Sequence, residues 1–115
     1  MSRPVLIYMT AGSTEEAKKV GRVLVEERLA ACVNILGGMT SLYWWDDAVQ
    51  EDDEVAFIAK TRQGMVDDVI ARVKEVHSYD CPCVVSISID DGNADFLQWI
   101  QEMTSQFPGH SSTGR

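Results

Sequence analysis

Alternation between apolar and polar residues divides the first third of the chain into a strand and a helix. Val5–Thr10 is a compact run of strand-forming residues, which predicts a buried first strand. Ser13, with Glu16 three residues later, forms a capping-box pattern that predicts the start of a helix. We expect this helix to end near Arg28 or Leu29. Its apolar face has the helical spacing i, i+3, i+4 and i+7: Ala17, Val20, Gly21 and Leu24.

The middle of the chain has the pattern of a long β-hairpin. Ala31–Ile35 predicts a second strand, in which Gly37–Gly38 indicates a β-bulge or a bend, and extended character continues over Met39–Trp45. The acidic stretch Asp46–Asp53 is predicted to contain the reversal, and Glu54–Thr61 to form the third strand. Much of this hairpin would project beyond so small a domain, and a projecting apolar ribbon usually meets another chain.

The last third of the chain repeats the alternation of helix and strand. Arg62–Val76 predicts a second helix, and His77–Cys83 a connector that Pro82 keeps irregular. Val84–Ile89 alternates apolar residues with Ser, which predicts a fourth strand, and Asp90–Asn93 is typical of a turn. A third helix is marked by apolar residues at helical spacing: Phe96, Leu97, Ile100 and Met103.

The predicted order β-α-β-β-α-β with an added C-terminal helix is that of an α+β, ferredoxin-like fold. Such a fold has an antiparallel sheet with helices on one face. No internal repeat and no linker interrupt the pattern, so we expect one domain over residues 1–107. Residues 108–115 are rich in Gly and Ser, and we expect them to form a disordered tail.

Composition excludes several classes of partner. The chain has 115 residues, 45% of them apolar, which is enough for one globular core. The net charge of −8 argues against nucleic acid and against an anionic membrane surface. No apolar run is long enough to span a bilayer, and the N-terminus has no signal-peptide pattern. Three cysteines make a disulfide framework improbable, and we expect a cytoplasmic protein.

Candidate chemistry is concentrated in the connector. His77, Cys81 and Cys83 lie within seven residues. Imidazole and thiolate ligands suit zinc or copper(I), but the spacing is not that of a structural zinc site. A thiol–imidazole reactive pair is an alternative, and two inert buried cysteines beside a proline are another. Lys60, in the third strand, could hold an anionic ligand or extend to water.

The aromatic cluster at the end of the second strand indicates an interface. Side chains alternate along a strand, so Tyr43 and Trp45 share one face and Trp44 takes the other. A nucleic-acid stacking platform would need basic flanks, whereas acidic residues follow this cluster. Subunit packing therefore explains the aromatic residues better.

In order and spacing, these segments resemble the CutA family of divalent-cation-tolerance proteins. The resemblance is carried by Leu29–Asn34, Thr40–Tyr43 with Trp45, Lys60–Thr61, His77 with Tyr79 and Pro82, and Trp99. It implies a fold similar to that of the PII signal proteins and a homotrimer in which long hairpins wrap the neighbouring subunits. It also implies no enzymatic activity, a role in divalent-cation tolerance and an association with copper. Ligands would bind in intersubunit clefts, at Tyr43, Trp45, Lys60, His77 and Tyr79.

The sequence departs from the family pattern at the positions implied for a metal. Ser78 stands where Pro is common, Cys83 where Glu is common, and Met9 where some members have Cys. A metal site at these positions would consist of Met9, His77 and Cys83, a softer set suited to copper(I). A divalent metal ion and a small anionic ligand are the alternatives to copper(I) as the ligand. The alternative functions are a PII-like sensor, a trimeric scaffold without a physiological metal, and a thiol enzyme.

Overall fold

The computed structural model describes residues 2–105 and shows a four-stranded antiparallel sheet with helices packed against it. The elements are β1 (Pro4–Ala11), α1 (Thr14–Glu26), β2 (Cys32–Trp45), β3 (Ala48–Arg62), a 3-10 turn (Gln63–Met65), α2 (Val66–Val76), β4 (Val84–Ser88) and α3 (Ala94–Met103). The strand order is β2-β3-β1-β4. The predicted ferredoxin-like α+β fold with a C-terminal helix is confirmed. The predicted tail, 108–115, lies outside the described residues.

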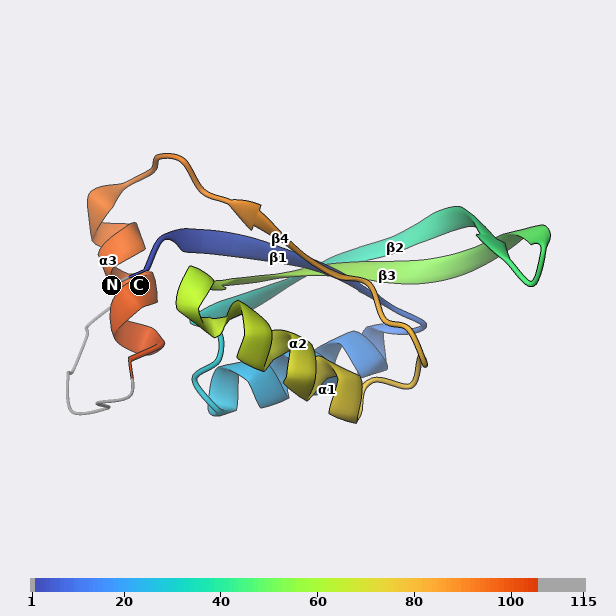
Figure 1. Ribbon diagram of the computed structural model, residues 1–115, viewed down its shortest axis with the longest axis horizontal. Coiled ribbons are helices and arrows are strands. Elements are labelled where there is room, and N and C mark those ends of the chain that lie inside the picture. Colours follow the sequence, from blue (N-terminus) through green and yellow to red (C-terminus); the bar gives the residue numbers. More distant parts are fainter. Residues whose placement is uncertain (1, 106–115) are drawn as a thin grey trace.

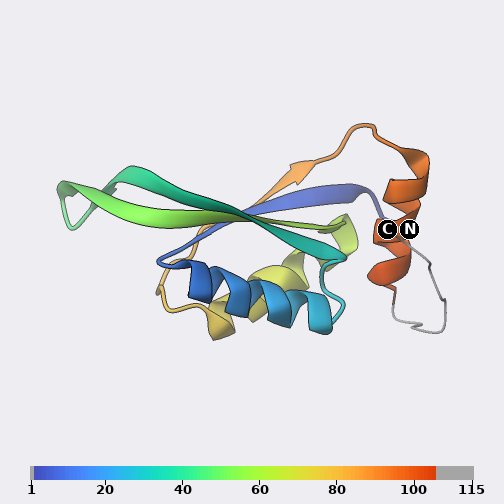
Figure 2. The ribbon, with the colours of Figure 1, turned by 180° about the vertical axis from the view of Figure 1, so that it is seen from behind.

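One face of the sheet carries the core. Helices α1 and α2 lie side by side on this face, and α3 lies at the end of the sheet beside the start of β1 (Figures 1 and 2). The sheet contributes alternate residues of β1 and β3, paired in register as Ile7 with Ala59 and Met9 with Phe57. The helices contribute apolar residues at helical spacing: Ala17, Val20 and Leu24 of α1, and Val66, Val69 and Val73 of α2.

The opposite face of the sheet is also apolar, although over its middle no helix of the described residues covers it (Figures 1 and 2). Tyr8 pairs with Ile58 and Val85, and Leu6 pairs with Ile87. Val85 and Ile87 are 50% and 53% exposed. An antiparallel sheet with one solvated face usually alternates apolar and polar residues. This sheet instead presents apolar side chains on both faces.

The hairpin of β2 and β3 projects far beyond the helices, as expected, and gives the chain its long axis of 49 Å against 26 and 23 Å (Figure 1). The pairing register shifts between Ile35 and Gly37, where Gly37 has φ +108°, so the predicted bulge is confirmed. Asp46 and Asp47 form the two-residue turn with φ of 52° and 58°, as a type I′ hairpin turn requires.

Several predicted boundaries were wrong. The third strand begins at Ala48, not Glu54, because the acidic residues after the turn pair with β2 as ordinary strand residues. Arg62 was placed in the second helix, but it ends β3, and its guanidinium donates to the Oγ1 and the carbonyl oxygen of Thr104, both at 3.1 Å. The first helix ends at Glu26, and β4 ends at Ser88.

Within residues 2–105, no helix has both the length and the apolar character that crossing a membrane requires.

Candidate functional site

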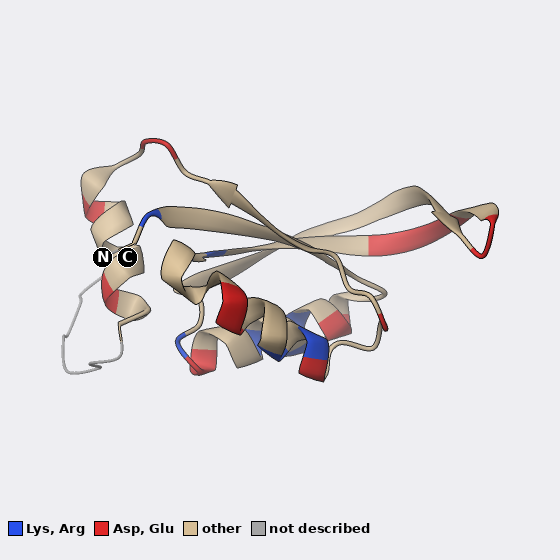
Figure 3. Ribbon diagram, viewed as in Figure 1, with Lys and Arg blue, Asp and Glu red and all other residues tan. Residues whose placement is uncertain are grey.

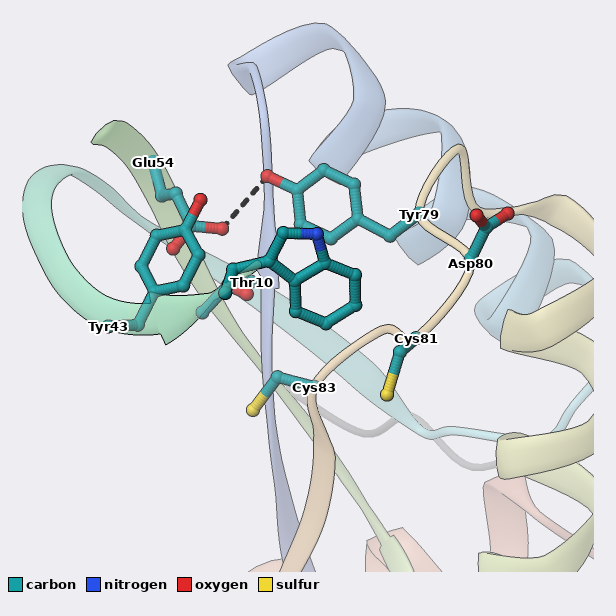
Figure 4. A pocket seen from close by; sticks show the side chains of 8 residues that line it. Thr10, Tyr43, Glu54, Tyr79, Asp80, Cys81 and Cys83 are labelled. Atoms are coloured by element: carbon teal, nitrogen blue, oxygen red, sulfur yellow. Dashed lines mark hydrogen bonds between the residues drawn. The ribbon is translucent and has the colours of Figure 1, made fainter. Parts of the chain in front are cut away.

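A cavity of about 430 Å³ opens where the hairpin, the end of β1 and the connector after α2 come together (Figure 4). Three separate segments supply its walls. Among the described residues it is lined by Thr10, Tyr43, Trp45, Glu54, Tyr79, Asp80, Cys81 and Cys83. The cavity therefore combines aromatic rings, carboxylates and thiols within one chain.

The hairpin and the connector are joined across the cavity by a hydrogen bond. The Tyr79 hydroxyl donates to Oε2 of Glu54 at 2.8 Å, as the dashed line in Figure 4 marks. On the hairpin itself, the Tyr43 hydroxyl donates to Asp52 on the paired strand. Tyr43 and Trp45 line the same cavity, which confirms that alternation puts them on one face.

Glu16 fixes the start of the connector to α1. Its carboxylate accepts the Ser78 N–H at 2.7 Å and the Ser78 hydroxyl at 2.9 Å, and the Gly12 N–H at 3.4 Å. Burial alone raises the pKa of Glu16, but the hydrogen bonds from the Ser78 hydroxyl, the Ser78 N–H and the Gly12 N–H together lower it below its ordinary value. The predicted capping residue thus also anchors one wall of the cavity.

His77 is a buried structural residue and does not line the cavity. Its side chain is 0% exposed. The Tyr79 N–H donates to Nδ1 at 3.0 Å, so Nδ1 carries no proton, and Nε2–H donates to the carbonyl oxygen of Thr10 at 2.8 Å. These two bonds define the neutral Nε2–H tautomer. The ring also packs against Tyr79, with centroids 4.6 Å apart. His77 therefore positions Tyr79 from behind.

The predicted metal-ligand set of Met9, His77 and Cys83 does not fit this arrangement. The Met9 thioether is fully buried in the helix-facing core, and both nitrogens of His77 are engaged with backbone groups. Cys83 alone of the three lines the cavity. Within residues 2–105, no group of three or more His, Cys, Asp and Glu side chains could hold a metal ion. A single chain thus presents no preformed site of this composition.

The electrostatics of the cavity are negative. Burial, the hydrogen bond to Glu54 and the charges of Glu54 and Glu16 raise the pKa of Tyr79 far above its ordinary value. Burial and the Glu54 charge likewise raise the pKa of the Cys83 thiol. A thiol nucleophile needs the opposite shift, toward the thiolate. Cys83 therefore lacks the activation that a thiol enzyme would need.

The structure brings together Tyr43, Trp45 and Tyr79 of the predicted ligand positions, and separates Lys60 from them. The Lys60 ammonium lies 5.4 Å from the ring centroid of Phe96 in α3, away from the cavity. Thr10, Glu54 and Asp80 were not among the predicted ligand positions. The signal that could have found Glu54 was its position as the last carboxylate of an acidic run, directly before the apolar residues of the strand.

Residues 5–103 match the family described as CutA1 divalent ion tolerance protein. The divalent-cation tolerance protein CutA of Pyrococcus horikoshii is 40% identical over 102 residues, covering 89% of the chain and 99% of that relative. CutA of Thermus thermophilus is 41% identical over 99 residues, covering 86% and 96%. Protein CutA of Homo sapiens is 36% identical over 97 residues, and the match spans 84% of the chain but 54% of that longer protein.

Solved structures of similar proteins share the fold closely. CutA1 from Oryza sativa superposes with a TM-score of 0.88 at 37% identity, covering 92% of the chain and 97% of the rice chain. The periplasmic divalent cation tolerance protein CutA from Archaeoglobus fulgidus superposes with a TM-score of 0.86 at 41% identity, covering 89% and 99%.

Proposed function

Because the chain belongs to the CutA1 divalent ion tolerance family, we propose that it works as a trimeric, non-enzymatic binding protein in divalent-cation tolerance. Its ligand site is the cavity between hairpin and connector, which lies where a neighbouring subunit would complete a cleft. The observation that carries the proposal is the apolar sheet face that the chain itself leaves open.

The open face supports assembly because its exposure has a free-energy cost that a second copy would remove. Val85 and Ile87 are half-exposed on β4, next to Tyr8 and Leu6 of β1. Burying apolar area is worth about 25 cal/mol per Å². In a small domain such a face typically marks a subunit interface, and closed symmetric assemblies are the usual outcome.

The projecting hairpin is a second, independent observation that supports the same assembly. Its far half exposes large apolar side chains: Leu42 at 68%, Trp44 at 74%, Trp45 at 55% and Val49 at 61%. Aromatic residues are enriched at interfaces, and an exposed apolar ribbon favours contact with another chain. A neighbour covering this ribbon would also lie beside the cavity, because Trp45 belongs to both.

The size of the cavity also favours a second candidate function, that of a PII-like small-molecule sensor. About 430 Å³ falls within the range of small-molecule pockets and exceeds what a dehydrated metal ion fills. The two candidate functions, metal response and small-molecule sensing, use the same site and the same assembly. They differ in the ligand, so direct binding measurements distinguish them.

Assembly is tested by a charge placed on the open face. In Ile87→Asp the carboxylate is harmless in a monomer, where Ile87 is 53% exposed, but it is buried unpaired if a neighbour covers the face. We expect light scattering after size exclusion to show three chain masses for the wild type and one for this variant. Ser86→Asp, on the same strand but the other face, is the matched control and should stay assembled. A wild type that elutes as one chain mass would refute the proposal.

Copper(I) is the metal to test first, because the two thiols that line the cavity are soft donors. Anaerobic copper(I) titration should show weaker binding by Cys83→Ser than by the wild type, and no loss for Cys32→Ser, whose position on β2 is outside the cavity lining. Identical affinities of all three proteins would exclude the Cys83 thiol as a ligand.

We propose a cytoplasmic location, although the similar Archaeoglobus fulgidus protein is described as periplasmic. The supporting observation is that no disulfide joins Cys32, Cys81 and Cys83, all of which the structure describes. Reducing compartments keep thiols in this state. Cell fractionation followed by immunoblotting tests the location directly, and recovery in a periplasmic fraction would contradict it.

A further inference from the structure

We propose that the aromatic end of the cavity binds a small organic cation of the ammonium type. This inference rests on the proposed function, because it takes the cavity as the ligand site and specifies the chemistry of the ligand. The juxtaposition that carries it is three aromatic side chains and a carboxylate from two segments distant in sequence: Tyr43, Trp45 and Glu54 from the hairpin and Tyr79 from the connector.

Aromatic rings are unusually concentrated in this lining. Three of the eight lining residues are Tyr or Trp. The face of an aromatic ring carries negative electrostatic potential and attracts a cation positioned over it. Several rings around one space form an aromatic cage, the arrangement that recognises alkylated ammonium groups. The three aromatic residues thus select for a cation that is bulky and weakly hydrated.

Charge in the lining has a single sign. The eight residues include Glu54 and Asp80, and none of them is Lys or Arg. The nearby His77 has the hydrogen bonds of a neutral ring, and the Lys60 ammonium is directed toward Phe96. An anionic ligand would therefore meet two carboxylates without a partner. A cation meets complementary charge, which is the condition that makes a polar contact favourable in a partly buried site.

Glu54 is held in place for this role. Tyr79 donates to its Oε2, while Oε1 accepts no hydrogen bond from another described residue. Tyr79 is itself fixed from behind, by its N–H bond to His77 and by the contact of the two rings. The carboxylate is thus oriented before a ligand arrives, and pre-organisation of this kind reduces the cost of binding.

The thiols occupy a different part of the cavity. Figure 4 shows the Cys81 and Cys83 sulfurs apart from the group formed by Tyr43, Glu54 and Tyr79. A soft metal at the thiols and an ammonium group at the aromatic end would then use separate donors. The organic cation therefore does not depend on copper binding, and each is tested in the absence of the other.

Calorimetric titration of the assembled protein with three probes of similar shape tests the ligand class. The probes are choline, its uncharged analogue with a tert-butyl group in place of trimethylammonium, and the anion trimethylacetate. We expect choline to bind at least about tenfold more tightly than the neutral analogue, since each cation–π contact contributes about 0.5–2 kcal/mol. Trimethylacetate should show no binding. Equal affinity for choline and the neutral analogue would overturn the proposal, and so would tighter binding of the anion.

Matched variants separate the cavity from the general acidity of the chain. Glu54→Gln keeps the shape of the side chain and should weaken choline binding by about tenfold, the effect of losing one partly buried charge. Asp53→Asn removes the same charge from the preceding residue of β3, which is exposed and outside the lining, and should leave affinity within about twofold. Tyr43→Leu should weaken binding, and Tyr43→Phe should not, because the ring and not the hydroxyl contacts the cation.

The subunit count distinguishes failure of this inference from failure of the proposed function. If the protein is a trimer and choline produces no heat, or if Glu54→Gln and Asp53→Asn weaken binding equally, the ligand class is wrong and the assembly stands. If light scattering gives a monomer, the proposed function fails. In that case, choline binding by the wild type that is lost in Glu54→Gln would still show that the cavity of a single chain binds the cation.

Discussion

Both halves of the β2–β3 hairpin carry large apolar side chains, but their surroundings are opposite. In the near half, Phe57 is fully buried under the helices. In the far half, Trp44 is 74% exposed, and no helix of residues 2–105 lies over this half of the hairpin (Figure 1). Figure 3 shows that acidic residues on β3 and at the turn accompany the exposed half. The same ribbon therefore serves as core at one end and as a protruding surface at the other.

This difference separates what one chain stabilises by itself from what only an assembly can stabilise. Core residues of the near half pack on α1 and α2, so their contribution does not depend on protein concentration. Apolar residues of the far half gain stability only when another copy covers them, and this contribution depends on concentration by mass action. Mutations in the two halves should therefore differ in kind, not only in size.

The largest effect is expected from Phe57→Ala. Removing a fully buried aromatic side chain should lower the free energy of unfolding by about 3–5 kcal/mol, from lost burial and from the cavity left behind. Urea denaturation followed by circular dichroism measures it. The loss should be the same at low and high protein concentration.

Trp44→Ala is the matched substitution in the far half. This substitution should weaken assembly by about 1–3 kcal/mol, seen as dissociation on dilution. It should leave the stability of the single chain nearly unchanged, because Trp44 is largely exposed there. A concentration-independent loss as large as that of Phe57→Ala would mean that the two halves do not differ as described.

An intermediate effect is expected at the bulge between the two halves. Gly37 has φ +108°, a conformation that L side chains rarely adopt, so Gly37→Ala should destabilise the chain by about 1–3 kcal/mol. Gly38→Ala is the control, since its added Cβ would lie 4.0 Å from the Glu54 carbonyl oxygen without a positive φ. It should change stability by less than about 0.5 kcal/mol. Thermal melts of both variants give the comparison, and equal losses would show that the bulge is not the cause.

The smallest effect is expected at Glu16, which anchors the connector to the near half. Hydrogen bonds outweigh burial and lower its pKa in the folded chain, so its stabilisation is present above the pKa of the unfolded chain and is lost as the pH falls through the folded pKa. Glu16→Gln should cost about 1 kcal/mol at neutral pH. This difference from wild type should shrink under acid conditions. Urea melts across the acid range measure it, with the exposed Glu15→Gln as control; a gap that does not depend on pH would contradict the assignment.

Periodicity predicted the near half well because burial there follows from the chain alone. The helix-facing positions of α1 and α2 and the alternation in β3 all have the spacing of their elements. The boundary at Glu54 failed because acidic residues are common in turns, whereas here only Asp46 and Asp47 have turn geometry. The placement of Arg62 in the second helix failed because the residue that it contacts, Thr104, is far away in sequence.

The site was predicted in part, for a comparable reason. Tyr43, Trp45 and Tyr79 could be placed from strand alternation and family resemblance, and they gather in one cavity. His77 was assigned to ligand binding because histidine suggests chemistry, but its partners are backbone groups that no side-chain pattern reveals. Met9 was assigned to the metal site from the family resemblance, but it lies in the strand that was predicted to be buried, and it is fully buried opposite Phe57.

The number of chains in the native particle tests the account most directly. Native mass spectrometry of the wild-type protein at micromolar concentration, purified without chelators, would report this number together with any bound mass. We predict three copies, with the exposed far half of each hairpin covered by a neighbour. A stable single chain at that concentration would contradict the account, because the open sheet face and Trp44 would then remain in water.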